Sequence, residues 1–298
     1  MPYLRLTFYV LSTVILCSLA TGLSQEGPAP ITQFNQFAHY TLIGVLAALV
    51  ANSTGAGGGI IFLPIFINLG LSPIESLATS LAIQCFGMNS GALAWLYHRH
   101  SILNKQANTQ IKLDWQQFYP IVRAATISSW FGLLAAQYWL PSPDLNIELA
   151  FSVFSLCIGS IILYRTLRTP QEHTERSKTL LQNERLGLII SCFIGGGITA
   201  WLSVGIGEVL AIYLIFLGFR INFAVACAVC VTATSVVIAM PYHLTVTQAV
   251  NIDVLVYAAP GALLGGALAK KLAMILGPRR LKLMMSVWII ISALVYLS

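Results

Sequence analysis

The stretch GAGGGIIFLP, from Gly55 to Pro64, interrupts a long apolar segment with four glycines, and SVGIGEVLAI, from Ser203 to Ile212, interrupts a second one. The two stretches align when positions 148 residues apart are superposed, with six identities in the 28 columns from Gly55 to Ala82. Each is followed by a short apolar run, a glycine turn and a long apolar helix. Broken helices at matching places in two halves of a chain indicate the binding site of a transporter. The sequence therefore predicts an internal duplication.

Composition predicts an all-α polytopic membrane protein. The chain is 57% hydrophobic and only 9% charged, with a mean hydropathy of +0.80, which cannot be arranged around one water-soluble core of 298 residues. About 20 apolar residues are needed to cross the roughly 30 Å of hydrocarbon in a bilayer. Runs that we expect to cross are Tyr3–Ala20, Ser76–Tyr97, Trp115–Leu140, Ile147–Leu167, Ala224–His243, Val250–Ala269 and Leu281–Leu297.

Two longer stretches, His39–Leu69 and Leu186–Leu217, contain the glycine breaks. As one helix, each would extend on the order of 46 Å at about 1.5 Å per residue, too long for a simple crossing. We expect each to form a hairpin of two shorter helices that enters and leaves on the same side. The predicted organisation is a hydrophobic segment and outer loop at residues 1–36, a first repeat at 37–167, a linker at 168–184 and a second repeat at 185–298.

The basic residues predict the orientation. With these crossings, fifteen of the 16 Lys and Arg residues fall in cytoplasmic segments, and only Arg123 lies within a helix. Short cytoplasmic loops collect Lys and Arg, so the C-terminus is expected outside a plasma or inner membrane and the two repeats are expected to be inverted. The N-terminus is cytoplasmic if Tyr3–Ala20 is an uncleaved helix, which we favour, although the segment also has the pattern of a signal peptide.

Charge and cysteine content exclude several classes of partner. The net charge of +6 is explained by basic residues at helix ends, and no basic stripe with interleaved aromatic residues indicates a nucleic acid. All six cysteines fall in predicted helices, so a disulfide framework is not expected. Five scattered histidines give no metal-ligand spacing, and we predict neither a metal nor a cofactor. Cys227 aligns with Thr79, and it either packs in the helix or lines a site for a sulfur-containing substrate.

The breaks themselves predict an anion site. A helix that begins inside the membrane exposes its first N–H groups and the positive end of its dipole. We expect half-helices beginning near Gly58 or Gly59 and near Gly207 to converge near the midplane, since glycine allows a sharp turn and close approach of a ligand. The candidate substrate-binding glycines are Gly55, Gly57, Gly58, Gly59, Gly205 and Gly207. The alternative, that the glycines only permit tight helix crossing, stays open.

Polar residues near the breaks complete the candidate site. Thr79, Ser80 and Gln84 span little more than one turn of the helix after the first hairpin and could donate to an oxyanion. Ionisable residues are costly within membrane spans and therefore indicate function. Glu208 is expected in the first turn of the second half-helix, where it could couple a proton to transport. Arg123 could either reach the anion or extend to the inner interface.

The first motif resembles a known family. Gly55–Pro64, followed by Gly70-Leu71-Ser72-Pro73 and Ala78-Thr79-Ser80-Leu81, is similar to the repeat signature of the TauE/SafE sulfite exporter (TSUP) permeases. The resemblance implies an inverted-repeat permease for small sulfur-containing anions such as sulfite or organosulfonates, linked to the proton gradient. In the second repeat Ser203, Ile206 and Ile212 stand where the family pattern has Gly, Gly and Pro. Ile206 is expected to narrow that side of the site.

The function expected from the sequence is therefore a secondary transporter, in the exporting direction that the resemblance implies, with alternating access. A permease for a carboxylate is the alternative within transport, and an intramembrane enzyme or a scaffold without transport are the alternatives outside it. An enzyme would need a nucleophile and a base at one depth, whereas Ser53 and Ser203 lie at the breaks and His39 and His243 near the outer face. The small residues Gly261, Gly265, Gly266 and Ala269 could serve a homodimer contact or internal packing.

Overall fold

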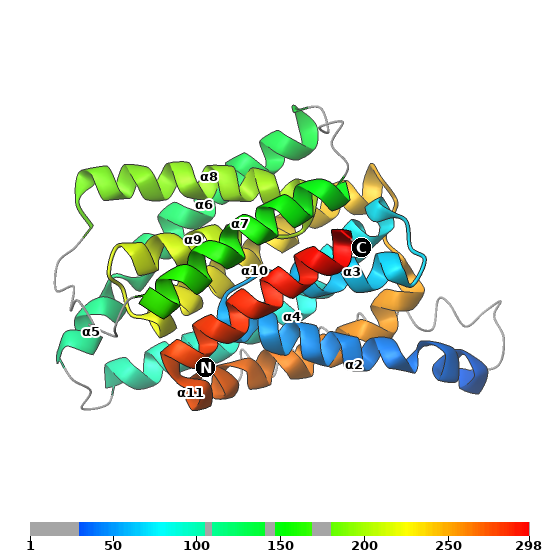
Figure 1. The fold of residues 1–298 in the computed structure, drawn as a ribbon, viewed down its shortest axis with the longest axis horizontal. Helices are drawn as coiled ribbons and strands as arrows, with labels where there is room; N and C mark the ends of the chain where they lie inside the picture. The colour runs from blue at the N-terminus through cyan, green and yellow to red at the C-terminus, as the bar shows by residue number, and fades with distance from the viewer. Residues whose placement is uncertain (1–29, 105–108, 141–146, 169–179, 298) are drawn as a thin grey trace.

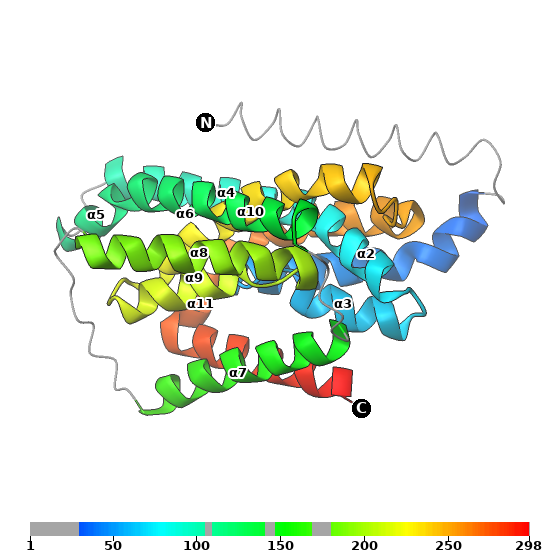
Figure 2. The same ribbon diagram turned by 90° about the horizontal axis from the view of Figure 1, so that it is seen from above.

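The structure, a computed structural model, describes residues 30–104, 109–140, 147–168 and 180–297. These residues form helices joined by short turns, and no strand occurs among them. The predicted first helix Tyr3–Ala20 and most of the linker at 168–184 lie outside the described residues. The helices run roughly along one long axis and pack side by side (Figures 1 and 2).

The first half contains the helices α2 (Pro30–Thr54), α3 (Gly59–Asn68), α4 (Pro73–Asn104), α5 (Thr109–Gln116), α6 (Phe118–Tyr138) and α7 (Ile147–Arg168). The second half contains α8 (Gln182–Leu202), α9 (Ile206–Phe216), α10 (Ile221–Thr245) and α11 (Ile252–Leu297). Gly277, with φ 72° and ψ 170°, divides α11 into two straight parts. Each half is thus a broken hairpin followed by three long helices.

The two hairpins enter the molecule from opposite ends. Figure 1 shows the turn after α3 at one end of the long axis and the turn after α9 at the other, and Figure 2 shows the same. Both turns have the same local structure, with Gly70 at φ 92° and Gly218 at φ 86°, a left-handed conformation that glycine adopts without strain. The arrangement is the one that inverted repeats require, and the repeat relationship itself stays a prediction.

Helix pairing also follows a two-fold pattern. The first part of α11 packs against α2, and α6 packs against α8, so the second of the three long helices in each half lies on the hairpin of the other half. The helices α4 and α10 pack against each other, as do α7 and the last part of α11. Glycines permit the two close contacts: a Cβ atom at Gly261 would meet the carbonyl oxygen of Thr41, and one at Gly196 would meet that of Ser129.

The small residues at positions 261, 265, 266 and 269 therefore serve internal packing, which decides an alternative that the sequence left open. Gly265 lies against Val45 in α2, Gly266 lies against Gly87 in α4, and Ala269 is fully buried. A homodimer stays a prediction that these residues do not support.

The predicted spans that lie within the described residues are recovered as helices, with differences in their bounds. The run Trp115–Leu140 is divided at Gln117 into α5 and α6, so Trp115 belongs to α5. The run Val250–Ala269 continues to Gly277 before the last helix begins. The first arm of each hairpin is long, with 25 residues in α2 and 21 in α8, whereas the second arms have 10 and 11. Each hairpin thus pairs a long helix with a half-length one.

The surface of the bundle is apolar where a bilayer would contact it. Three described helices are long and apolar enough to cross a membrane, namely Gln182–Leu202, Ile221–Thr245 and Ile252–Gly277. Large apolar side chains on the outer faces of α6, α8 and α11 are exposed, including Phe131, Ile190, Phe193, Ile194 and Leu264. Contiguous apolar surface of this kind is not expected in water. Polar groups such as Asn52, Gln84 and Glu208 are buried inside instead. The protein is an all-helical polytopic membrane protein.

Candidate functional site

The two glycine breaks meet in the interior of the bundle. A Cβ atom at Gly207 would meet the carbonyl oxygen of Gly55, and one at Gly59 would meet the backbone of Ser203. The half-helices begin as predicted, α3 at Gly59 and α9 at Ile206. Gly55 and Gly205 have φ angles of 84° and 143°, which side chains rarely allow. The breaks are therefore in backbone contact, and glycine is required on both sides of it.

One carboxylate joins the two breaks. Glu208 lies in the first turn of α9 and is fully buried. Its Oε1 accepts a hydrogen bond from the backbone N–H of Gly57 (2.8 Å), and its Oε2 accepts one from the N–H of Gly205 (2.8 Å). The second bond is the capping interaction of an acidic residue three positions after the N-cap. The first bond reaches across to the other half of the chain, so Glu208 occupies the place predicted for a substrate anion.

A second set of hydrogen bonds lies beside Glu208. The Gln84 Oε1 accepts from the N–H of Gly58 (2.9 Å), and the Gln84 Nε2 donates to the Ser203 Oγ (2.9 Å) and the Ser80 Oγ (3.1 Å). The hydroxyls of Ser80 and Ser203 are also 2.9 Å apart. We call this set the junction, which comprises Gly57, Gly58, Ser80, Gln84, Ser203, Gly205 and Glu208. In the junction, side chains of the protein accept from the N–H groups of Gly57 and Gly58, just before α3, and of Gly205, the N-cap of α9.

One hydroxyl near the junction has no partner. Thr232 in α10 is 2% exposed, and its Oγ1 makes no hydrogen bond. It lies 3.0 Å from where a Cβ atom of Gly207 would be, in the first turn of α9. Thr232 and Gln84 are 148 positions apart, the offset that aligns the repeats. The two equivalent positions therefore differ in their hydrogen bonding. The Gln84 side chain accepts from the Gly58 N–H in the first break, whereas the Thr232 hydroxyl lies beside the second break without a hydrogen-bond partner.

A small, mostly apolar pocket adjoins the junction on the side of Gly57. Thr54, Gly57 and seven apolar residues line it, among them Ile60, Trp288 and Ile289. The lining comes from α2, α3, the first break and the last part of α11. Its interior holds about one water molecule, so a substrate anion beside the Gly57 N–H group, which donates to Glu208, would need the surrounding helices to move apart.

Comparison with known families identifies the chain. The sequence model described as sulfite exporter TauE/SafE matches residues 40–296, which is nearly the whole described part of the protein. The chain belongs to the TauE/SafE family. No curated protein and no solved structure matches it. The resemblance inferred from the first motif is confirmed, and with it the assignment to membrane transporters of the sulfite exporter type.

The positions at which this TauE/SafE protein departs from the family pattern now have a structural context. Ser203 has a left-handed conformation, with φ 58°, which explains why glycine would suit the position. Its hydroxyl instead contributes to the junction. Ile206 is 1% exposed, and its side chain packs against Gly195 in α8. Its bulk therefore fills the contact between α8 and α9 within the hairpin.

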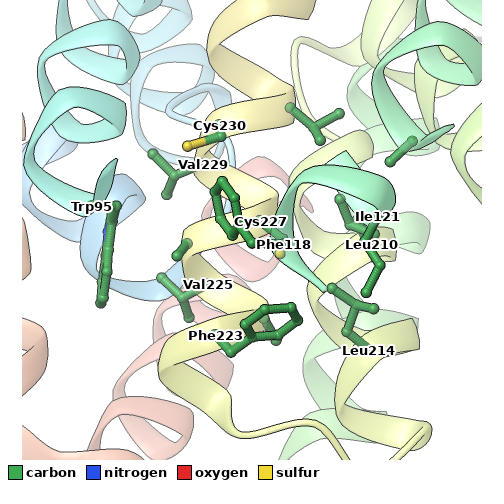
Figure 3. Packing of buried hydrophobic residues seen from close by; sticks show 14 of the residues in the cluster. Trp95, Phe118, Ile121, Leu210, Leu214, Phe223, Val225, Cys227, Val229 and Cys230 are labelled. Carbon is green, nitrogen blue, oxygen red and sulfur yellow. The ribbon is translucent and has the colours of Figure 1, made fainter. Parts of the chain in front are cut away.

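Three predicted site residues lie apart from the junction. The hydroxyl of Thr79 accepts a hydrogen bond from the N–H of Asn251 (2.9 Å), where it fixes the start of α11. Cys227 is fully buried in an apolar cluster with Trp95, Phe118 and Val229 (Figure 3), which favours packing over a substrate contact. Arg123 is exposed on α6. The face of α6 that packs on α8 and α10 carries Ser128, Ser129 and Gly132, and Arg123 points to another side.

Sequence reasoning found Glu208, Gln84 and Ser80 but missed two other residues. The hydroxyl of Thr199 accepts from the N–H of Ile206 (2.8 Å), so it satisfies the next donor of the second break. Thr199 lies in a Gly-Gly-Gly-Ile-Thr run before the break, and an alignment restricted to the glycine motifs does not include it. The other missed residue is Thr232 in α10. Its equivalence to Gln84 is the sequence signal that could have found it.

Proposed function

We propose that this protein is a secondary transporter of a small sulfur-containing anion, such as sulfite or an organosulfonate, which binds between the two breaks. Export is the direction that the family description gives. One observation carries the proposal: an oxyanion group, the Glu208 carboxylate, already bridges the N–H groups of Gly57 and Gly205 at 2.8 Å each. A sulfite or sulfonate group has oxygens of the same kind, and helix N-termini favour negative charge.

Further support comes from the groups around the bridge. The unpaired Thr232 hydroxyl is a donor without an acceptor, and a buried donor of this kind costs free energy unless a ligand or water satisfies it. Backbone breaks buried within the bundle are tolerated at membrane depth where protein surrounds them or where they line a cavity. Alternating access would then open the junction to one side at a time.

A permease for a carboxylate is the second candidate, and a specific observation favours it. The group that occupies the bridge is itself a carboxylate, so the geometry accepts a planar oxyanion as well as a pyramidal or tetrahedral one. Competition separates the two: acetate should inhibit sulfite flux strongly if carboxylates are the substrates and weakly if sulfur oxyanions are.

Hydrolysis at the junction has less support. The Ser80 and Ser203 hydroxyls bond to each other and to Gln84, which cannot act as a base. His243 is buried against Gln137 and Thr247 elsewhere in the bundle. No histidine among the described residues is hydrogen-bonded to a serine of the junction. A transporter without an enzymatic step is the proposal that fits these partners.

Substitution of the glycine at the contact between the breaks tests the proposal. In Gly207→Ala the new Cβ would meet the Gly55 carbonyl oxygen, and overpacking of this kind typically costs about 1–3 kcal/mol. If this cost raises the free-energy barrier of the transport cycle, sulfite efflux from loaded proteoliposomes should slow by roughly 5 to 150-fold. The matched control is Gly197→Ala, where the nearest atom would be 3.6 Å away. Equal flux in both variants would contradict a role for the breaks.

A further inference from the structure

The bridging carboxylate has an unusual pair of partners. Its two oxygens accept from N–H groups that belong to different halves of the chain, and no ion pair involving Glu208 occurs among the described residues. The equivalent position in the first repeat, 148 residues earlier, is Ile60. A single acid therefore satisfies donors of both breaks, and the arrangement has no second acid to replace it.

The polar side chains that the structure places beside the two breaks are neutral. Helix α8 contributes Thr199, α4 contributes Gln84, and α10 contributes Thr232. The titratable side chains on the helices that pack against α9 include the thiols of Cys192 in α8 and of Cys227 and Cys230 in α10, which belong to the apolar cluster. Since no cation fixes the carboxylate, the two N–H groups are what hold its charge. Removing the charge would loosen both contacts at once.

We propose that Glu208 is a tethered competitor of the transported anion, which leaves the bridge when it takes up a proton. This inference rests on the proposed function and specifies how the same site is regulated. A proton added to one carboxylate oxygen makes that oxygen a donor. The N–H group that it accepted from, on Gly57 or Gly205, then loses its partner, and an oxygen of the incoming anion replaces it. No other bond is made or broken.

This mechanism determines how many protons move with each anion and in which direction. One proton and one monovalent anion occupy the site together, cross together and leave on the same side, so the step moves no net charge. Export then follows the outward gradient of the anion and carries a proton out with it. Over the range in which Glu208 titrates, the apparent anion affinity should fall by up to about tenfold for each unit of rising pH, as linkage to one proton requires.

The test uses methanesulfonate, a strong-acid anion whose own charge does not change with pH. Wild-type protein in proteoliposomes that contain a pH dye should acidify the lumen when methanesulfonate is added outside, and clamping the membrane potential should leave the rate unchanged. In Glu208→Gln the amide offers one acceptor and one donor group, as a protonated carboxyl does. Any exchange of labelled methanesulfonate that this variant retains should be independent of pH and should move no protons. Asp253→Asn, an exposed carboxylate at the start of α11, is the matched control.

The outcomes separate the two proposals. Methanesulfonate flux without proton movement in the wild type, or proton-coupled flux in Glu208→Gln equal to wild type, would overturn the tethered competitor and leave anion transport standing. Absence of flux for methanesulfonate, sulfite and acetate in the wild type would overturn the proposed function, and the inference with it. Because the wild-type dye measurement decides the coupling by itself, poor folding of the glutamine variant would not leave the question open.

Discussion

Ser203 shows how one residue links the two breaks. It ends α8 in a left-handed conformation, which for a residue other than glycine costs roughly 1–2 kcal/mol. The cost is offset by its hydroxyl, which contacts Gln84 and Ser80 from the other half of the chain. Hydrogen bonds between membrane helices contribute about 0.6 kcal/mol each on average. The free energy gained from two such hydrogen bonds is therefore similar to the free-energy cost of the left-handed conformation.

Two substitutions at Ser203 separate these effects. Ser203→Ala keeps the left-handed strain and loses both hydrogen bonds, whereas Ser203→Gly loses the bonds and relieves the strain. We expect the alanine variant to be less stable than the glycine variant by about 1 kcal/mol. Thermal or denaturant unfolding of the purified protein in detergent measures the difference. An alanine variant as stable as the glycine variant would show that the conformation carries no strain.

The partners of the site residues could not be predicted from the sequence, although their identity could. The residue types at the breaks indicated an anion site and singled out Glu208, Gln84 and Ser80. The partner of Glu208 is Gly57, 151 positions earlier, and the partner of Gln84 is Ser203, 119 positions later. Contacts of this separation depend on how the two hairpins pack, which periodicity and propensity do not encode. The sequence therefore predicted an open anion site, whereas the structure fills it with the protein's own groups.

Among the elements, α6 shows what determines the position of a charged residue. Helix α6 packs on α8 and α10 through small residues such as Ser129 and Gly132, and Arg123 lies on an exposed face. The place of a residue in the sequence of a helix predicts its depth along the helix axis. It does not predict which face of the helix the residue lies on when the helix is apolar all round. For this reason the sequence left two roles open for Arg123, and its exposed position on α6 disfavours contact with an anion at the junction.

Removing the charge at Arg123 checks this assignment. Arg123→Gln should leave the KM for sulfite within about twofold of wild type, because the side chain is not at the junction. Gln84→Leu, the comparison variant, removes the acceptor of the Gly58 N–H and the donor to Ser203, so it should raise KM or abolish flux. Flux measured at several sulfite concentrations distinguishes them. A KM for Arg123→Gln raised tenfold or more would return this residue to the site.

The elements themselves were largely predictable because glycine breaks and long apolar runs determine them. The hairpins, the helix starts at Gly59 and Ile206 and the long helices α4 and α10 all follow from the pattern. The bounds that differ have local causes. Gly277 adopts a left-handed φ of 72° and ends the first part of α11 beyond the predicted residue, and the helix α2 begins before the apolar run does. Helices extend beyond the apolar runs in the sequence because their terminal turns can consist of polar residues.

At the scale of the whole molecule, the two-fold pattern of helix pairing gives each half the same surroundings. The hairpins begin at opposite ends of the bundle (Figure 1), and the α2 contact with α11 matches the α8 contact with α6. In a membrane this pattern would place the two hairpin turns on opposite sides. The excess of Lys and Arg predicts which side is which, since basic residues collect in the cytoplasm.

Reporter fusions test this orientation. Alkaline phosphatase fused after Ser298 should be active, because the C-terminus is predicted outside, and a fluorescent protein fused there should be dark. Fusions placed after Arg220, at the turn between α9 and α10, should give the opposite pair of results. The same signal from both positions would contradict the inverted arrangement.

The most direct test of the central claim, that anions cross between the two breaks, is uptake of radiolabelled sulfite by proteoliposomes that contain the purified wild-type protein. Uptake should saturate, accelerate when the outside is made more acidic than the lumen, and fall when unlabelled sulfoacetate or taurine is added. Empty liposomes provide the background. Uptake that does not exceed this background, with or without the pH gradient, would contradict the account.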